Sequence, residues 1–283
     1  MKAGASIAAF LHGRRGVYTT MRSVGIKSIF SLPEHVRRLA LVPQALDPQG
    51  RHDSFDEEAT SRVLVPKLRE AMARFTAECG ASAGEMKISA AMRLRDESTD
   101  AATATLEDME VLVAVEQLYD LRLTAVSVEL ALHGSRDNPT IKHGQWIEQR
   151  KALEEKMRPD CNEVVLVDGQ GLVYEGLSSN VMALDSSGTL WTAPSETVLT
   201  GTVMQLVLSV CEASQIRVRR ACPTVELLCG SSVLISSTSR LTLPVERLYL
   251  LDGTAVTLSF SPLARELVGK VKEQIDQRCT QIL

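Results

Sequence analysis

The sequence lacks any long hydrophobic run, and every apolar stretch falls short of the roughly 18–20 residues that cross a bilayer. Its six cysteines form no C-x-x-C pair, and no histidine lies near them at zinc-ligand spacing. We therefore expect reduced thiols in a cytoplasmic protein and no metal site. The net charge of −4 gives no basic excess, which argues against binding to nucleic acid or to a membrane surface.

The rest of the composition is that of an ordinary globular protein. Hydrophobic residues make up 45% and charged residues 23% of the 283 positions, with no repeat or low-complexity tract. This length allows one large or two medium domains. Near the N-terminus the apolar run at 5–11 is followed by the positive charges of Arg14 and Arg15. In a targeting segment the positive charges precede the apolar run. We therefore predict a first strand there and not a targeting segment.

Hydrophobic periodicity and turn residues predict a mixed α/β chain. Strands are expected at 5–11, 17–24, 87–94, 110–115, 121–132, 163–167, 172–174, 181–184, 189–191 and 232–236. Helices are expected at 31–40, 61–79, 141–157, 203–213 and 261–277, with Ser31 and Ser261 as N-caps. The pattern predicts two α/β domains: an N-terminal domain at 1–128, a linker at 129–140 around HGSRDNPT, and a C-terminal domain at 141–283.

The most informative stretch joins a lysine to a downstream carboxylate and a glycine-led helix. Glu175 follows Lys142 by 175 − 142 = 33 residues, and it opens the sequence E-G-L-S-S-N before L-T-G-T-V at 199–203. Pyridoxal 5'-phosphate (PLP) needs an amine for its aldehyde, an acid for its ring nitrogen, and amides with hydroxyls for its phosphate. The order of these pieces therefore predicts a PLP site.

Each piece alone also has an ordinary interpretation. Lys142 lies between Ile141 and Trp146, where desolvation would favour Schiff-base chemistry, yet a solvated surface lysine would have the same sequence. Glu175 could equally be an edge-strand glutamate. The turn after it, including Ser179 and Asn180, could be plain turn chemistry.

Two further segments are suited to anions. Gly201 opens a predicted helix, whose free amides and positive dipole end attract phosphate, although unliganded helix starts are common. The run 236–240 places four hydroxyls, including those of Thr238 and Ser239, beside Arg240 after a buried strand. This run is suited to binding a phosphate or a carboxylate, although an ordinary polar loop would have a similar sequence.

These segments together resemble the class IV (fold-type IV) PLP-dependent aminotransferases, the group that includes branched-chain aminotransferases, D-amino-acid aminotransferases and aminodeoxychorismate lyase. The resemblance spans nearly the whole chain. Its matching segments are YTTMR (18–22), HVRRL (35–39), IKH (141–143), EGLSSN (175–180), LTGTV (199–203) and SSTSRLTLPV (236–245). It implies the two-domain fold of that group, with a smaller N-terminal domain and a larger PLP-binding C-terminal domain at 141–283, and a homodimer.

The resemblance also implies roles for individual residues. Lys142 is the expected Schiff-base lysine, and Glu175 the expected partner of the pyridine nitrogen. Further cofactor contacts are expected from Arg38, Ser179, Asn180, Gly201, Thr202, Val203 and Thr238, where Val203 stands in place of a usual threonine and offers only its amide. Substrate contacts are expected from Tyr18, Arg22, Arg93, Arg95, Ser239 and Arg240.

The four arginines among the substrate residues exceed what one α-carboxylate requires, because a single guanidinium can bind it through two hydrogen bonds. We therefore expect a dicarboxylic partner such as 2-oxoglutarate to be preferred as amino acceptor. The alternative is that two or more of these side chains point to solvent.

The sequence thus predicts an aminotransferase that moves an amino group between an α-amino acid and an α-keto acid. Two alternatives stay open. The first is a lyase of the aminodeoxychorismate type, which would release pyruvate by β-elimination. The YTTMR strand and the IKH start resemble those of this lyase more closely, and Thr19, Thr20 and Thr238 could assist the elimination. A non-catalytic module that only binds the cofactor is less consistent with the intact pair of Lys142 and Glu175.

Overall fold

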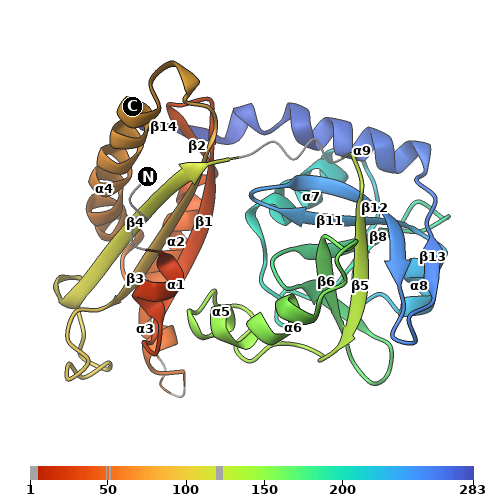
Figure 1. Ribbon diagram of the computed structural model, residues 1–283, viewed down its shortest axis with the longest axis horizontal. Coiled ribbons are helices and arrows are strands. Elements are labelled where there is room, and N and C mark those ends of the chain that lie inside the picture. Colours follow the sequence, from red (N-terminus) through yellow and green to blue (C-terminus); the bar gives the residue numbers. More distant parts are fainter. Residues whose placement is uncertain (1–5, 49, 51, 119–123) are drawn as a thin grey trace. The chain divides into compact units, whose positions relative to one another are not determined.

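The computed structural model describes residues 6–48, 50, 52–118 and 124–283. Within them the chain divides into two compact units (Figure 1). Unit 1 comprises residues 1–119, 141–149 and 276–283, and unit 2 comprises residues 120–140 and 150–275. Among the described helices, none combines the length and apolar character that a membrane crossing requires.

Unit 1 contains a five-stranded sheet with strand order β14-β2-β1-β3-β4. Its strands are β1 (Gly16–Val24), β2 (Ser28–Phe30), β3 (Met86–Leu94), β4 (Met109–Gln117) and β14 (Cys279–Gln281). Its helices are α1 (Ile7–Leu11), α2 (Leu32–Ala40), α3 (Val42–Leu46), α4 (Glu57–Cys79) and α5 (Gln145–Gln149). Neighbouring strands are antiparallel throughout.

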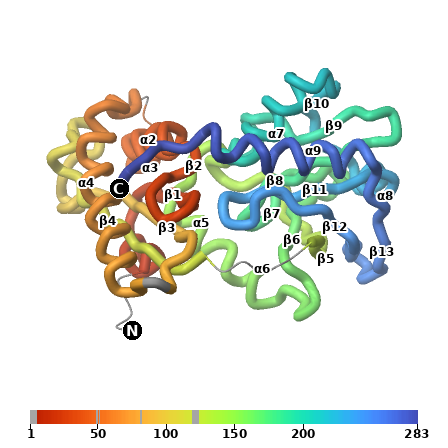
Figure 2. The backbone as a smooth tube through the Cα atoms, turned by 90° about the horizontal axis from the view of Figure 1, so that it is seen from above, coloured from red at the N-terminus to blue at the C-terminus, as the bar shows by residue number. Residues whose placement is uncertain are grey.

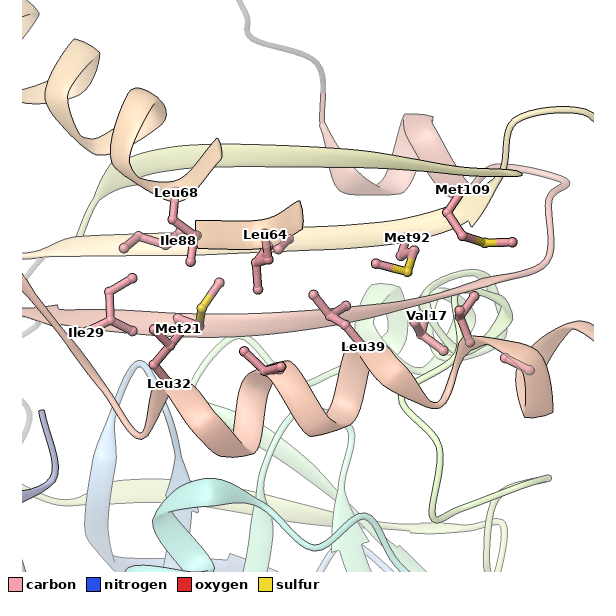
Figure 3. Packing of buried hydrophobic residues seen from close by; sticks show 14 of the residues in the cluster. Val17, Met21, Ile29, Leu32, Leu39, Leu64, Leu68, Ile88, Met92 and Met109 are labelled. Carbon is pink, nitrogen blue, oxygen red and sulfur yellow. The ribbon is translucent and has the colours of Figure 1, made fainter. Parts of the chain in front are cut away.

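The alternation of side chains along β1 separates two cores in unit 1. Val17 and Met21 face the helices α2 and α4, where they pack with Leu39 and Leu64 (Figure 3). Tyr18 belongs to a smaller cluster with residues of α1. Because successive strand residues point to opposite faces, this one strand both anchors the core and presents its next residue to the other face of the sheet.

Unit 2 contains a nine-stranded sheet. Its strands are β5 (Val126–Leu132), β6 (Glu163–Val167), β7 (Val173–Gly176), β8 (Asn180–Leu184), β9 (Leu190–Thr192), β10 (Val218–Arg220), β11 (Ser232–Ser237), β12 (Leu241–Tyr249) and β13 (Ala255–Thr257). Its helices are α6 (Lys151–Lys156), α7 (Thr202–Ala213), α8 (Val225–Cys229) and α9 (Pro262–Glu273). Helices α7 and α9 pack against each other, and they also contact β11 and β12 respectively (Figure 2).

Strand pairing closes part of this sheet on itself. β7 pairs with β6 on one side and with β8 on the other, so β8, β11, β12, β5, β6 and β7 form a ring. β6 and β8 are buried along their whole length, and Val165, Val181 and Val233 share one core. The short β7 is therefore held on both edges, and Glu175 lies on it.

Most predicted elements occur within one to four residues of their expected ends. Ser261 caps α9 as predicted, since its hydroxyl accepts a hydrogen bond from the amide of Ala264. Ser31 also holds the N-cap position of α2, but its backbone is left-handed and its side chain accepts no capping hydrogen bond. Of the strand predicted at 121–132, residues 121–123 lie outside the described part, and the remainder contains β5.

Two predicted elements are wrong. The strand expected at 5–11 is the helix α1, because Ser6 caps it through the amide of Ala9 and Ile7 with Leu11, four residues apart, share its buried face. The short apolar run is compatible with both the helical and the strand period, so periodicity could not decide between a helix and a strand. Residue 5 lies outside the described part.

The helix expected at 141–157 is broken into a strand-like start and two short helices, α5 and α6. The backbone of Lys142 accepts a hydrogen bond from the amide of Tyr18, and Gly144 donates one to Gly16. This pairing with β1 includes a bridge between Val17 and His143 and keeps the first residues extended. The predicted domain boundaries stay predictions.

The central strand β11 provides a test of the unit 2 core. Leu234 is fully buried between β8 and β12, whereas Leu251, in the turn after β12, is 55% exposed. Leu234→Ala should lower the free energy of unfolding by about 2–5 kcal/mol, because it removes buried contacts and leaves a cavity. Leu251→Ala should change it by less than about 0.5 kcal/mol in the same urea titration. Equal effects would contradict the proposed core.

Candidate cofactor site

Glu175 is held as a buried carboxylate in unit 2. One oxygen accepts a hydrogen bond from Nε of Arg136 at 2.6 Å, and the other accepts one from the amide of Leu199 at 3.2 Å. The side chains of Arg136 and Glu175 are 2% and 6% exposed. A charge this deeply buried needs a compensating partner, and Arg136 supplies it.

Arg136 is itself fixed by its own loop. It donates a second hydrogen bond to the carbonyl of Pro139 at 2.8 Å, and Ser135 donates one to the carbonyl of Thr197 at 2.6 Å. The segment 133–139 is thereby tied to the loop before α7, on which Leu199 lies. Both partners of Glu175 thus come from connected loops.

Asn180 braces the same region from the strand that follows the turn. Its side chain donates to the carbonyl of Leu199 at 2.6 Å and accepts from the amide of Gly201 at 3.1 Å. A Cβ atom on Gly201 would lie 2.2 Å from the side-chain oxygen of Asn180, so only glycine permits this approach. Gly201 is also the N-cap of the 12-residue helix α7.

Two threonine hydroxyls meet near the start of α7. Oγ1 of Thr202 lies 3.3 Å from Oγ1 of Thr238, which follows β11. Val203 is buried inside the first turn of the helix. The structure thus brings the hydroxyls of Thr202 and Thr238 together beside Gly201. Helix-start amides and hydroxyls are groups that bind phosphate in proteins, and the cofactor contacts of these three residues stay predictions.

The hydroxyl of Ser179 is directed elsewhere. It donates to the buried carboxylate of Glu163 at 2.9 Å, as does the hydroxyl of Ser178 at 2.8 Å. Arg240 completes this group, with Nη2 2.6 Å from the same carboxylate oxygen. The predicted cofactor contact of Ser179 and the predicted substrate contact of Arg240 stay predictions.

In unit 1, Lys142 lies beside Tyr18. Its ammonium is 4.7 Å from the centre of the aromatic ring of Tyr18, within the range of a cation–π contact. The backbone of Lys142 is fixed by pairing with β1, whereas the side chain is half-buried. The structure thus presents this lysine from a rigid strand edge.

Behind Lys142, Thr19 connects His35 to Arg38. Oγ1 of Thr19 lies 2.6 Å from Nδ1 of His35, and Arg38 donates to the same oxygen at 3.4 Å. Burial lowers the pKa of Arg38 to about 10. Burial also lowers the pKa of His35 well below its usual value, and the positive charges of Arg38 and Lys142 lower it further.

The other predicted substrate arginines of unit 1 have internal partners. Arg22 forms an ion pair with Glu85, and Arg93 pairs with Glu110 at 3.0 Å while lying over the ring of Phe10. Arg95 donates to the carbonyl of Met109 at 3.1 Å. Their substrate role stays a prediction, and each of the three side chains contacts a group within unit 1.

Sequence reasoning missed Arg136, Glu163 and His35 as members of these groups. Arg136 lies in the polar stretch HGSRDNPT, which has the composition of a linker. Glu163 is the first residue of a correctly predicted strand, and its inward orientation has no local signal. His35 stands three residues before Arg38, a helical spacing that places both on one face and could have indicated it.

The buried histidine gives a testable pH dependence. Because the folded pKa lies below the unfolded value, the unfolded chain binds more protons at low pH, so stability is complete above about pH 6.5 and falls below it. His35→Gln should remove this component. The difference in unfolding free energy between wild type and variant should therefore shrink by up to about 1.4 kcal/mol per pH unit below 6.5, measured by urea titration at pH 7 and 5.5. Parallel stability profiles would contradict a buried neutral His35.

The fold has many solved relatives. A branched-chain aminotransferase from Thermoproteus uzoniensis, solved with norvaline, matches with a TM-score of 0.74 and 17% identity, covering 100% of this chain and 95% of its own. A hypothetical aminotransferase from Mycobacterium tuberculosis, in its PLP-bound form, matches with a TM-score of 0.73 and 19% identity, covering 98% and 96%. At these identities the similarity establishes the α/β fold.

No curated protein sequence matches this chain. The model of the family described as amino-transferase class IV matches residues 16–248, which include most of both units. This confirms the resemblance and the fold class expected from the motifs. The chain belongs to the class IV aminotransferase family.

Proposed function

We propose that this protein is a PLP-dependent aminotransferase in which Lys142 attaches the cofactor and Glu175 interacts with its pyridine nitrogen. The buried pair of Glu175 and Arg136 carries the proposal, because a fixed internal carboxylate is what a protonated ring nitrogen requires. Family membership supports the aminotransferase activity, and the PLP-bound relative from Mycobacterium tuberculosis supports the cofactor.

The described residues fit this cofactor. In unit 2, Gly201, Thr202 and Thr238 would hold a phosphate through the amides and hydroxyls at the start of α7. In unit 1, the buried Arg38 is the residue whose guanidinium the sequence motif assigns to the phosphate. When bound, PLP supplies an electron sink for bond breaking at the substrate α-carbon. Every other contribution comes from side chains and backbone amides of the protein.

Lys142 has two roles in this proposal. Its amine would hold the cofactor covalently, and as general base and acid it would take the proton from the substrate α-carbon and deliver it to the cofactor. The extended backbone pairing to β1 fixes the start of the side chain, while its four-carbon stem allows the amine to move. A neutral His35 nearby adds no positive charge to this amine.

We further propose that the substrates are an α-amino acid and an α-keto acid and that the working form is a cytoplasmic homodimer. A related protein from Mycobacterium tuberculosis, 20% identical, has been solved with α-ketoglutarate and pyridoxamine phosphate, which supports a dicarboxylic acceptor. The six free cysteines support a reducing compartment. Light scattering on the purified protein tests the dimer.

The attachment residue is directly testable. Borohydride reduction of the purified holoenzyme should fix the cofactor on a peptide that contains Lys142, and Lys142→Ala should abolish the visible absorption band of attached cofactor. Lys151→Ala, which removes a lysine that is 72% exposed, serves as the matched control and should keep the band. Labelling of another lysine would overturn the assignment. Pyruvate release without any keto acid would instead indicate the lyase reaction.

The carboxylate should affect turnover more than cofactor retention. Glu175→Gln should lower kcat by roughly 10²–10⁴-fold, the range expected when a positioned charged or proton-transferring group is lost. Glu196 is an exposed carboxylate in the loop before α7, and Glu196→Gln should keep kcat near the wild-type value. Because the change leaves the charge of Arg136 buried, the double variant Arg136→Met with Glu175→Gln provides a folded comparison. A near wild-type rate in Glu175→Gln would refute the role.

A further inference from the structure

The proposed function leaves one buried carboxylate of unit 2 without a role. Glu163, the first residue of β6, is 4% exposed, and its Oε2 accepts hydrogen bonds from Ser178 at 2.8 Å, from Ser179 at 2.9 Å and from Arg240 at 2.6 Å. Arg240 also donates to the hydroxyl of Ser178 and to the carbonyl of Asn162. This set of residues is called the Glu163 cluster below.

The Glu163 cluster joins two turns that come from distant parts of the chain. One turn, 177–179, connects Glu175 on β7 to Asn180 on β8. The other connects β11 to β12 and contains Thr238, and there the amide of Arg240 donates to the hydroxyl of Ser237 at 3.2 Å. The Arg240 side chain therefore adds a direct side-chain connection between these two turns, next to the backbone pairing of Ser236 with Asn180.

The first turn is tightly packed against Glu163. A Cβ atom at Gly176 would lie 2.4 Å from the hydroxyl oxygen of Ser179 and 2.9 Å from Cγ of Glu163. Only glycine therefore fits at position 176, between the Ser179 hydroxyl and Glu163. Gly176 directly follows Glu175 on β7, so the Glu163 cluster packs against the backbone next to Glu175.

We infer that Arg240 is a positioning residue: its pair with Glu163 keeps turn 177–179 and turn 238–240 in fixed relation, and its guanidinium does not bind a second substrate carboxylate. This rests on the proposed function for its catalytic consequence, but the coupling of the two turns does not. A substrate carboxylate at Arg240 would have to compete with Glu163 for the guanidinium. If it displaced Glu163, the Glu163 carboxylate would be a buried charge without its partner.

The coupling is tested first in cofactor-free protein by amide hydrogen exchange. Arg240→Met should speed exchange of the amides at 176–180 by roughly 10- to 150-fold, which corresponds to the loss of a hydrogen bond to a charged group. Glu163→Gln should affect the same amides. The double variant Glu163→Gln with Arg240→Met leaves no unpaired buried charge, so its amides at 176–180 should exchange no faster than those of Arg240→Met. Arg247→Met, an exposed arginine on β12, is the matched control and should leave these amides unchanged.

Acceptor kinetics test the specificity part. In Arg240→Met, kcat/KM for 2-oxoglutarate and for 2-oxoisocaproate should fall by the same factor, and Glu163→Gln should keep the ratio of the two at its wild-type value. Unchanged exchange in both single variants would overturn the coupling of the turns. A loss in Arg240→Met that is at least tenfold larger for 2-oxoglutarate would overturn the positioning role and establish Arg240 as a substrate contact. Faster exchange in a protein without transaminase activity would refute the proposed function alone.

Discussion

The burial of the Glu175 carboxylate beside Arg136 is the constraint on which the unit 2 site depends. A carboxylate with 6% exposure is tolerated because a guanidinium lies 2.6 Å away and a backbone amide binds its second oxygen. These partners lie on the segment 133–139 and on the loop before α7, so compensation of one charge fixes two loops that have no regular structure. The pair is better explained by position than by stability, since a buried ion pair seldom adds net free energy of folding.

The same rule organises the other charged groups of the chain. Glu163 is satisfied by Arg240 and two serine hydroxyls, and in unit 1 Arg38 is buried beside a histidine that burial keeps neutral. In each group, side-chain hydrogen bonds connect different elements of one unit. Polar networks of this kind lose most of their value when one member is missing, because the remaining buried groups lose their partners.

The sequence predicted the motifs and most elements, because those depend on local signals. The cap at Ser261, the strand at 163–167 and the glycine at the start of α7 all have a signature within a few residues. The break at 142–144 does not, because it is caused by pairing with β1, more than 120 positions earlier. Arg136 and Glu163 were missed for the same reason: only distant contacts distinguish them from loop and strand residues.

The pairing of 142–144 with β1 also explains why chain order is a poor guide to the proposed attachment lysine. Lys142 follows the polar segment 133–140, yet its backbone continues the hydrogen bonding of the first strand, and its ammonium lies against Tyr18 of that strand. A lysine that must both hold a cofactor and carry a proton needs a fixed Cα and a mobile amine. Strand pairing provides the first, and the unbranched side chain provides the second. The β1 strand therefore serves the chemistry through its backbone as much as through its side chains.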